Sequence, residues 1–215
     1  MAVEPGVVTD SETVLVPGAR DVRATLDAPD ADACVVACPP HPQMGGKRSD
    51  SRLTAVADAV APDVATLRFD YGAWDEGVGE LADARNALAW ARDRYDAVAL
   101  FGYSFGGCIA LLAAARESAA GMPPAAVAAL APASRLSADL DAVAALDTID
   151  APGYVLYGER DTTAEWEPVV ERARALGWLV ESMAADHHFV GQAGKVGERC
   201  GAFLRDALAP GSRDY

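Results

Sequence analysis

A serine between two glycines carries the strongest chemical signal in this chain. Ser104 lies at the centre of the pentapeptide G-Y-S-F-G at residues 102–106. The apolar run 97–101 before it has the composition of a buried strand, and residues 107–115 after it are rich in helix formers. In this context the G-x-S-x-G pattern is typical of a nucleophile elbow, a sharp strand-to-helix turn that projects the serine hydroxyl. The sequence therefore predicts a nucleophilic serine at position 104.

A serine hydroxyl becomes an effective nucleophile only when a base takes its proton and an acid orients that base. Of the three histidines, His187 and His188 follow the last expected strand, and His41 lies in a proline-rich loop. Asp161 follows another expected strand. Because the carboxyl ends of parallel strands meet at one edge of a sheet, we expect Ser104, Asp161 and His187 to converge there.

Other residues compete for the role of the acid. Glu159 stands directly at a strand end, whereas Asp186 is too close in sequence to its neighbouring histidine to face that ring easily. A structural role for Asp161 is also open, as the cap of a turn or helix at residues 162–164.

The elements that must position these residues follow from the apolar pattern of the chain. Strands are expected at 13–16, 22–26, 34–38, 64–69, 97–101, 126–130, 154–157 and 179–183, and helices at 51–60, around 81–90, at 107–115, 136–146, 164–176 and 195–208. Residues 39–46 are expected to form a loop without regular structure. An opening hairpin followed by repeated strand–helix units predicts an α/β fold, a mostly parallel sheet with helices on both faces.

The composition limits the class of protein. With 215 residues, 51% of them hydrophobic, we expect one domain over residues 1–215, with frayed ends at 1–10 and 210–215. The formal net charge is −14, and the acidic residues are dispersed, a composition that resembles that of salt-in halophiles; an ordinary acidic protein is the alternative. The sequence has no basic patch, and this disfavours nucleic-acid binding.

The compartment and the redox state are predicted from the same composition. No apolar run approaches the ~20 residues that span a bilayer, and the N-terminal residues lack a signal-peptide pattern. This predicts a cytoplasmic protein with no membrane association. Four cysteines (Cys34, Cys38, Cys108 and Cys200) have no metal-ligand spacing, so we expect reduced thiols in the core. The sequence does not indicate an oligomeric state.

Nearly the whole chain resembles the small α/β-hydrolases of the dienelactone-hydrolase-like, serine-esterase kind. The matching segments are 41–46 (HPQMGG), 67–71 (LRFDY), 102–107 (GYSFGG), 157–161 (YGERD) and 185–187 (ADH). The resemblance implies an α/β-hydrolase fold with His187 as the base. His188 takes a position that is usually aromatic, and it is the alternative base. Residues 70–74 depart from the Asn-Phe-Arg-Gly that such proteins more often carry. Dienelactone hydrolases proper use a cysteine nucleophile, so Ser104 argues against that reaction.

The expected function is that of a serine hydrolase that cleaves a carboxylic ester or thioester of a small-molecule acyl substrate, without cofactor or metal. The oxyanion would be held by the Phe105 N–H and by the N–H of Gln43 or Met44. His41 either makes a hydrogen bond that shapes this loop or faces solvent.

The positions of the tryptophans and the length of one connection predict features of the substrate site. Trp74 and Trp166 could edge the pocket, whereas Trp90 and Trp178 fit the core. The short stretch between the strands at 126–130 and 154–157 leaves little or no lid, which disfavours bulky triglycerides.

A non-catalytic binding or scaffold module with the same fold is the alternative, favoured if the pocket is filled or the three side chains fail to converge. Peptidase, acyltransferase and perhydrolase activities use the same triad, and the sequence does not separate them.

Overall fold

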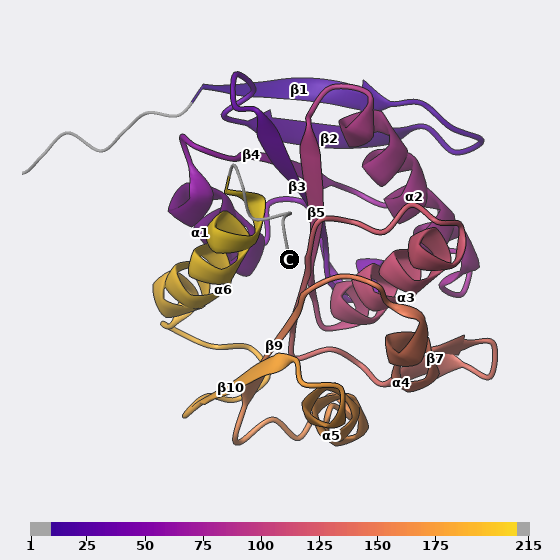
Figure 1. Cartoon of the computed structure of the whole chain (residues 1–215), viewed down its shortest axis with the longest axis vertical. Helices are drawn as coiled ribbons and strands as arrows, with labels where there is room; N and C mark the ends of the chain where they lie inside the picture. Colours follow the sequence, from indigo (N-terminus) through magenta and orange to yellow (C-terminus); the bar gives the residue numbers. More distant parts are fainter. Residues whose placement is uncertain (1–9, 210–215) are drawn as a thin grey trace, which may run out of the picture.

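One sheet organises residues 10–209, the part of the chain that the computed structural model describes (Figure 1). Within these residues eight strands run in the order β1-β2-β4-β3-β5-β6-β9-β10. β2 is antiparallel to β1 and to β4, and the other neighbours are parallel. The strands are β1 (Ser11–Val16), β2 (Val22–Asp27), β3 (Ala33–Cys38), β4 (Ala65–Phe69), β5 (Ala97–Tyr103), β6 (Val127–Leu130), β9 (Gly153–Gly158) and β10 (Leu179–Met183).

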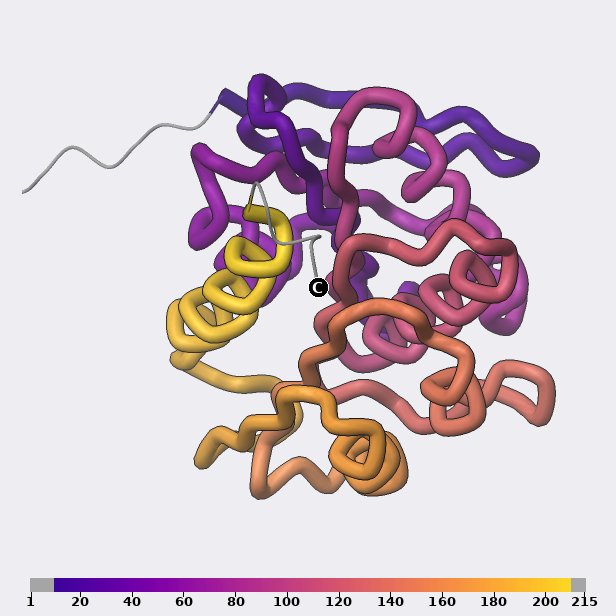
Figure 2. The backbone as a smooth tube through the Cα atoms, viewed as in Figure 1, coloured from indigo at the N-terminus to yellow at the C-terminus, as the bar shows by residue number. Residues whose placement is uncertain are grey.

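Helices cover both faces of this sheet. α1 (Ser51–Val60) and α6 (Ala193–Leu208) pack on one face, and α2 (Val78–Arg92), α3 (Phe105–Ala119), α4 (Ala142–Ala145) and α5 (Glu167–Ala175) lie on the other (Figures 1 and 2). β3 shows why an unbroken apolar run forms a central strand. Its alternate residues enter two different core clusters, Val36 on the side of α2 and α3 and Val35 on the side of α1 and α6.

The parallel strands direct four loops to one edge of the sheet. The chain leaves β3 towards His41, β5 towards Ser104, β9 towards Asp161 and β10 towards His187. Since β3, β5, β6, β9 and β10 are consecutive parallel neighbours, these loops all begin at the carboxyl edge.

The expected fold class, an opening hairpin and a mostly parallel sheet with helices on both faces, is confirmed. Three local expectations were wrong. Residues 136–146 are not one helix: they form the hairpin β7 (Arg135–Ser137) and β8 (Leu140–Asp141), followed by α4 and the 3₁₀ helix η2 (Leu146–Thr148). The loop at 39–46 contains a 3₁₀ helix, η1 (Pro42–Met44), and α5 begins at Glu167 rather than near residue 164.

The first of these differences has a clear physical reason. The spacing of Leu136 and Leu140 fits one helical face, but in the structure Leu140 is buried in the core while Leu136 stays partly exposed beside the cavity described below. Asp141 caps the short α4, because its Oδ1 accepts the Ala144 N–H at 3.0 Å. Asp141, a residue type that starts helices, therefore lies in the middle of the expected helix and marks the start of a shorter one.

The expected fraying at 1–10 and 210–215 falls outside the described residues except for Asp10, and the extent of the domain stays a prediction. None of the helices between residues 10 and 209 has the length and apolar composition that crossing a membrane requires.

Candidate active site

Ser104 occupies a strained turn between β5 and α3. Its backbone has φ 58° and ψ −117°, a conformation that a residue with a side chain rarely adopts. The flanking glycines are required because a Cβ on Gly102 would lie 2.0 Å from the Gly106 carbonyl oxygen, and a Cβ on Gly106 would lie 2.2 Å from that of Cys38. The turn therefore needs glycine at position 102, where the chain packs against its own backbone, and at position 106, where it packs against the end of β3.

Ser104, His187 and Asp161 meet in one chain of hydrogen bonds. His187 Nε2 lies 2.9 Å from Ser104 Oγ, and His187 Nδ1 lies 2.7 Å from Asp161 Oδ2. The Asp161 carboxylate is fully buried and the imidazole is 7% exposed. The structure therefore brings together the three residues that were selected from the sequence.

Asp161 also performs the structural role that was considered as its alternative. Its Oδ1 accepts the N–H groups of Thr163 and Ala164 at 2.9 and 3.1 Å, while Oδ2 faces His187. Trp166 donates its Nε1–H to the Asp161 carbonyl at 3.1 Å. The carboxylate is thus held by its own loop, which fixes the position of the oxygen that contacts the imidazole.

The competing residues lie elsewhere. Glu159 is exposed and accepts a hydrogen bond from Ser182 Oγ at 2.8 Å. Asp186 accepts the His188 N–H at 3.0 Å, and neither has a hydrogen bond to His187. His188 is exposed, and its ring meets that of His187 edge to face at 5.4 Å between centroids.

The amides expected to hold an oxyanion differ in their hydrogen bonding. Phe105 is the first residue of α3, where an N–H has no acceptor within the helix. Gln43 donates its N–H to His41 Nδ1 at 3.3 Å, and Met44 donates its N–H to the His41 carbonyl at 3.0 Å. The Gln43 and Met44 N–H groups are therefore already bonded within their loop. Of the three amides, the Phe105 N–H, directly after Ser104, is the one that makes no such bond in this loop.

His41 shapes the loop after β3, as one of its two expected roles required. It caps η1 through Nδ1, and its ring stacks on Trp74 at 4.6 Å and tilts against Phe105 at 4.9 Å. Desolvation lowers the pKa of His41, although Glu80 opposes the shift. A neutral ring is consistent with an Nδ1 that accepts the Gln43 N–H.

A cavity of about 340 Å³ opens over Ser104. Its lining residues include Ser104 and all three histidines of the chain, with Tyr103, Phe105, Ala133, Leu136 and Met44 as apolar walls. Trp74 and Trp166 are not part of this wall: one supports His41 and the other supports Asp161. Trp90 is buried and Trp178 packs against the core, as expected.

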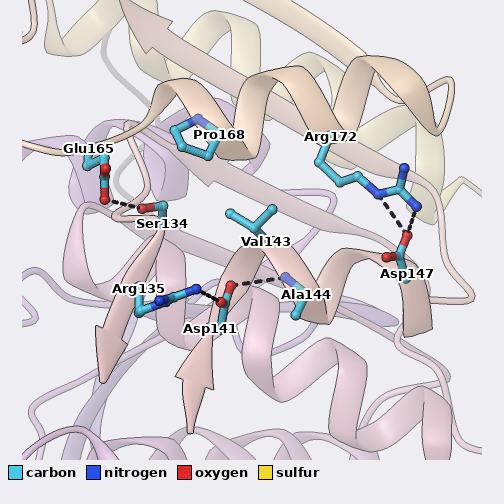
Figure 3. Close-up of a pocket in the computed structure, with 9 residues that line it drawn as sticks. All are labelled: Ser134, Arg135, Asp141, Val143, Ala144, Asp147, Glu165, Pro168 and Arg172. Atoms are coloured by element: carbon cyan, nitrogen blue, oxygen red, sulfur yellow. Dashed lines mark hydrogen bonds and ion pairs between the residues drawn. The ribbon is translucent and has the colours of Figure 1, made fainter. Parts of the chain in front are cut away.

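A second cavity, of about 430 Å³, lies between α5 and the β7–β8 hairpin, with its side chains drawn in Figure 3. Four of its charged groups form ion pairs, Arg135 with Asp141 and Arg172 with Asp147, and Glu165 accepts a hydrogen bond from Ser134 Oγ at 2.9 Å. None of the three triad residues lines it, so we place the candidate site at the cavity above Ser104. In the part of the chain that is described, no group of three His, Cys, Asp or Glu side chains is arranged to hold a metal ion.

Comparison with known proteins gives the family. A family model for the thioesterase domain matches residues 76–199, more than half of the chain. The chain belongs to the thioesterase domain family. The matched range contains the three triad residues of this thioesterase-family chain but neither the His41 loop nor α1. A search of curated proteins finds no significant match.

Solved structures similar to this thioesterase-family chain share its fold. An α/β serine hydrolase homologue from Coxiella burnetii has 24% identity and a TM-score of 0.74, covering 90% of this chain and 97% of that one. An α/β serine hydrolase without a lid from Xanthomonas campestris has 21% identity and a TM-score of 0.77, covering 96% and 99%. Est1E from Butyrivibrio proteoclasticus, in a structure with ferulic acid bound, has 16% identity and a TM-score of 0.77, covering 92% and 100%. The chain therefore has the α/β-hydrolase fold. Its membership of the thioesterase domain family makes it an enzyme of the ester-hydrolase type.

Two residues of this thioesterase-family chain that contact the triad loop were missed in the sequence. Tyr103 donates its hydroxyl to the His187 carbonyl at 2.9 Å, and Arg52 donates to the His188 carbonyl at 3.3 Å. Position 103 is the variable residue of the G-x-S-x-G pattern, and position 52 lies far upstream in α1. Neither carries a spacing signal that points to the histidine loop.

Proposed function

We propose that the protein hydrolyses carboxylic esters or thioesters of small-molecule acyl substrates through an acyl-enzyme formed on Ser104. The observation that carries the proposal is the position of the His187 ring, with Nε2 at 2.9 Å from Ser104 Oγ and Nδ1 at 2.7 Å from Asp161 Oδ2. Because a carboxylate only accepts hydrogen bonds, the proton of a neutral imidazole lies on Nδ1, and Nε2 is free to take the serine proton.

The reaction has two halves. Ser104 Oγ attacks the acyl carbonyl as its proton passes to His187 Nε2, and Asp161 stabilises the imidazolium. The Phe105 N–H, at the positive end of α3, donates to the oxyanion of the tetrahedral intermediate. The bond to the alcohol or thiol then breaks and the proton on Nε2 leaves with that group. A water molecule repeats the sequence on the acyl-enzyme, which releases the acid and restores the serine.

The second oxyanion donor predicted from the sequence requires a local exchange. Gln43 or Met44 could contribute only by giving up the bond that its N–H makes to His41. The bond to Nδ1 is the longer one, at 3.3 Å, which favours Gln43 as the donor that an oxyanion could recruit.

The shape of the cavity supports small or extended acyl groups. It is about 340 Å³ in volume, and only the short β7–β8 hairpin, α4 and η2 stand between β6 and β9. Ferulic acid, a small aromatic acid, is bound in one of the similar structures. Bulky triglycerides do not fit this proposal, because the cavity is small and there is little or no lid over it.

A non-catalytic binding module would require a filled pocket or separated triad residues. The open cavity and the two short triad distances both count against it. We therefore retain hydrolysis as the proposed function.

Labelling with a fluorophosphonate serine probe tests the proposal, since this probe reacts only with an activated serine. The wild type should be labelled and Ser104→Ala should not, while Ser182→Ala, which removes a hydroxyl bonded to Glu159, should be labelled like the wild type. The experiment is run at low and at multimolar salt, with circular dichroism to establish folding. A folded wild type that is not labelled at either salt concentration would overturn the proposed function.

A further inference from the structure

The loop that carries His187 is tied down through two successive backbone carbonyls. Tyr103, the last residue of β5, donates its buried hydroxyl to the His187 carbonyl at 2.9 Å. Arg52, in the first turn of α1, donates Nη1–H to the next carbonyl, that of His188, at 3.3 Å. We propose that Tyr103 and Arg52 are positioning residues, which act through this loop to hold the His187 ring between Ser104 and Asp161; the inference rests on the proposed function.

Arg52 is itself fixed from two sides. Asp50 caps α1, because its Oδ1 accepts the Arg52 N–H at 2.9 Å, and its Oδ2 binds Arg52 Nη2 at 2.6 Å. The guanidinium lies over the Tyr103 ring, with Cζ 4.4 Å from the ring centroid. Asp50, Arg52 and Tyr103 are therefore connected to one another, and the two that bind the loop, Arg52 and Tyr103, are in contact.

Tyr103 is well suited to a permanent role as a donor. Its side chain is buried, and burial raises its pKa to about 12, although Arg52 opposes the shift. The hydroxyl therefore stays protonated over the working pH range. The position in sequence matters as well, because Tyr103 directly precedes Ser104. Its hydroxyl joins the strand that carries the nucleophile to the loop that carries the base.

The loop needs such ties because the imidazole must satisfy two short distances at once. Beyond the histidines, Phe189 has a positive φ of 49° and is buried, so the backbone turns sharply directly after them. A shift of about 1 Å in a reacting group can cost about 100-fold in rate. Losing either carbonyl bond should let the ring drift away from Ser104. Tyr103 and Arg52 also line the cavity, and only Tyr103→Phe removes its bond while keeping the ring that forms the wall.

The test compares Tyr103→Phe, Arg52→Met and Arg52→Lys with the wild type on a neutral p-nitrophenyl ester. Removal of one hydrogen bond, typically worth about 1 kcal/mol, should lower kcat by about fivefold in Tyr103→Phe and in Arg52→Met. KM should be unchanged within about twofold in Tyr103→Phe, because this variant keeps the ring that lines the cavity. Arg52→Lys keeps a cationic donor and should recover part of kcat. The double variant should lose less than the product of the single losses, because both bonds hold the same loop.

A tyrosine and an arginine at the opposite edge of the sheet serve as matched controls, because their side chains also donate hydrogen bonds to backbone carbonyls. Tyr95 donates its hydroxyl to the Pro29 carbonyl at 3.3 Å. Arg94 lies over the Trp90 ring at 3.9 Å and donates to the Trp90 carbonyl at 2.9 Å. Both precede β5, whereas Ser104 follows it. Tyr95→Phe and Arg94→Met should therefore keep the wild-type kcat.

A signal that does not depend on turnover separates this inference from the proposed function. The downfield proton resonance of His187 Nδ1–H reports its bond to Asp161 and should move or broaden in Tyr103→Phe and Arg52→Met but not in the two controls. An unchanged kcat and an unchanged resonance in both site variants would overturn the inference. A wild type without esterase activity or labelling would instead overturn the proposed function, and the resonance would still decide whether the loop is positioned as inferred.

Discussion

Replacing Asp161 by asparagine tests the triad through the tautomer of one ring. The side chains have the same size, but an amide has one accepting and one donating end. In the structure Oδ1 faces two donors, the N–H groups of Thr163 and Ala164, while Oδ2 faces His187 Nδ1. The amide oxygen should stay with the two donors, so the amide NH₂ points at Nδ1. His187 must then accept at Nδ1 and carry its proton on Nε2, where it blocks the uptake of the proton from Ser104.

The size of the effect follows from the same contacts. To restore the productive tautomer, the amide must flip and turn its NH₂ towards the two loop donors. Each donor left without an acceptor costs about 1–3 kcal/mol, or about 2–6 kcal/mol for the pair. At about 1.4 kcal/mol for each factor of ten, the productive form falls by about 30-fold to about 10⁴-fold, and kcat should fall with it.

The assay is kcat on a p-nitrophenyl ester for the wild type and Asp161→Asn, with thermal unfolding to show that both are folded. Glu159→Gln is the matched control, because it makes the same chemical change on the acid that competes in the sequence and lies in the same loop. It should retain wild-type kcat. A loss below about tenfold in Asp161→Asn, or an equal loss in Glu159→Gln, would refute the tautomer argument.

Three further predictions concern stability. Burial would raise the pKa of Glu117, but hydrogen bonds from Arg85 and Arg92 outweigh it and lower that pKa. Its stabilisation is therefore full above the ordinary glutamate pKa of about 4.3 and is lost as the pH falls through the lower folded-state pKa; the difference in melting temperature between wild type and Glu117→Gln should shrink accordingly. Gly106→Ala should fail to fold, because its Cβ would lie 2.2 Å from a backbone oxygen. A Cβ at Gly194 meets no atom within 4 Å, so Gly194→Ala should raise the free energy of unfolding, measured in urea, by about 0.4–1 kcal/mol. The melting temperature should rise between about 0.1 M and about 3 M KCl, since salt screens the repulsion within a chain of net charge −14.

Each of these predictions has a result that contradicts it. A pH-independent difference for Glu117→Gln would mean that the carboxylate is not held by its arginines. A folded, active Gly106→Ala would mean that the elbow has more room than the structure gives it. A melting temperature that does not change with salt would remove the halophile interpretation of the composition and favour an ordinary acidic protein.

The sequence predicted most of the sheet because the central strands are buried on both faces. β3 and β5 are continuous apolar runs, and such runs have few alternatives. Hydrophobic spacing failed where packing decided the structure. Residues 136–146 have helical spacing but divide between the cavity and the core, and α5 starts late because Asp161 holds the N–H groups of Thr163 and Ala164 in a turn.

Ser104, Asp161 and His187, the residues of the proposed triad, could be selected because each follows a strand and has a residue type that the chemistry requires. The contacts that hold His187 were not, since Arg52 is 136 positions away from the carbonyl that it binds. The hydrogen bonds of Gln43 and Met44 were equally hidden, because they depend on the short η1 turn in a loop expected to be irregular. Local patterns identify reactive groups, whereas the supports of those groups depend on tertiary contacts.

The β7–β8 hairpin gives this hydrolase a place where its substrate range can change independently of its chemistry. Ser137, Ala138 and Asp139 at its tip are exposed, and Leu136 beside them lines the cavity above Ser104. Exposed tips of this kind accept inserted residues more readily than buried segments do. A longer insertion there would extend over the acyl site while the loops that carry the serine, the aspartate and the histidine keep their own anchors. Different segments inserted at this tip, by evolution or by grafting, could thus change the acyl specificity while the loops of the proposed triad stay as they are.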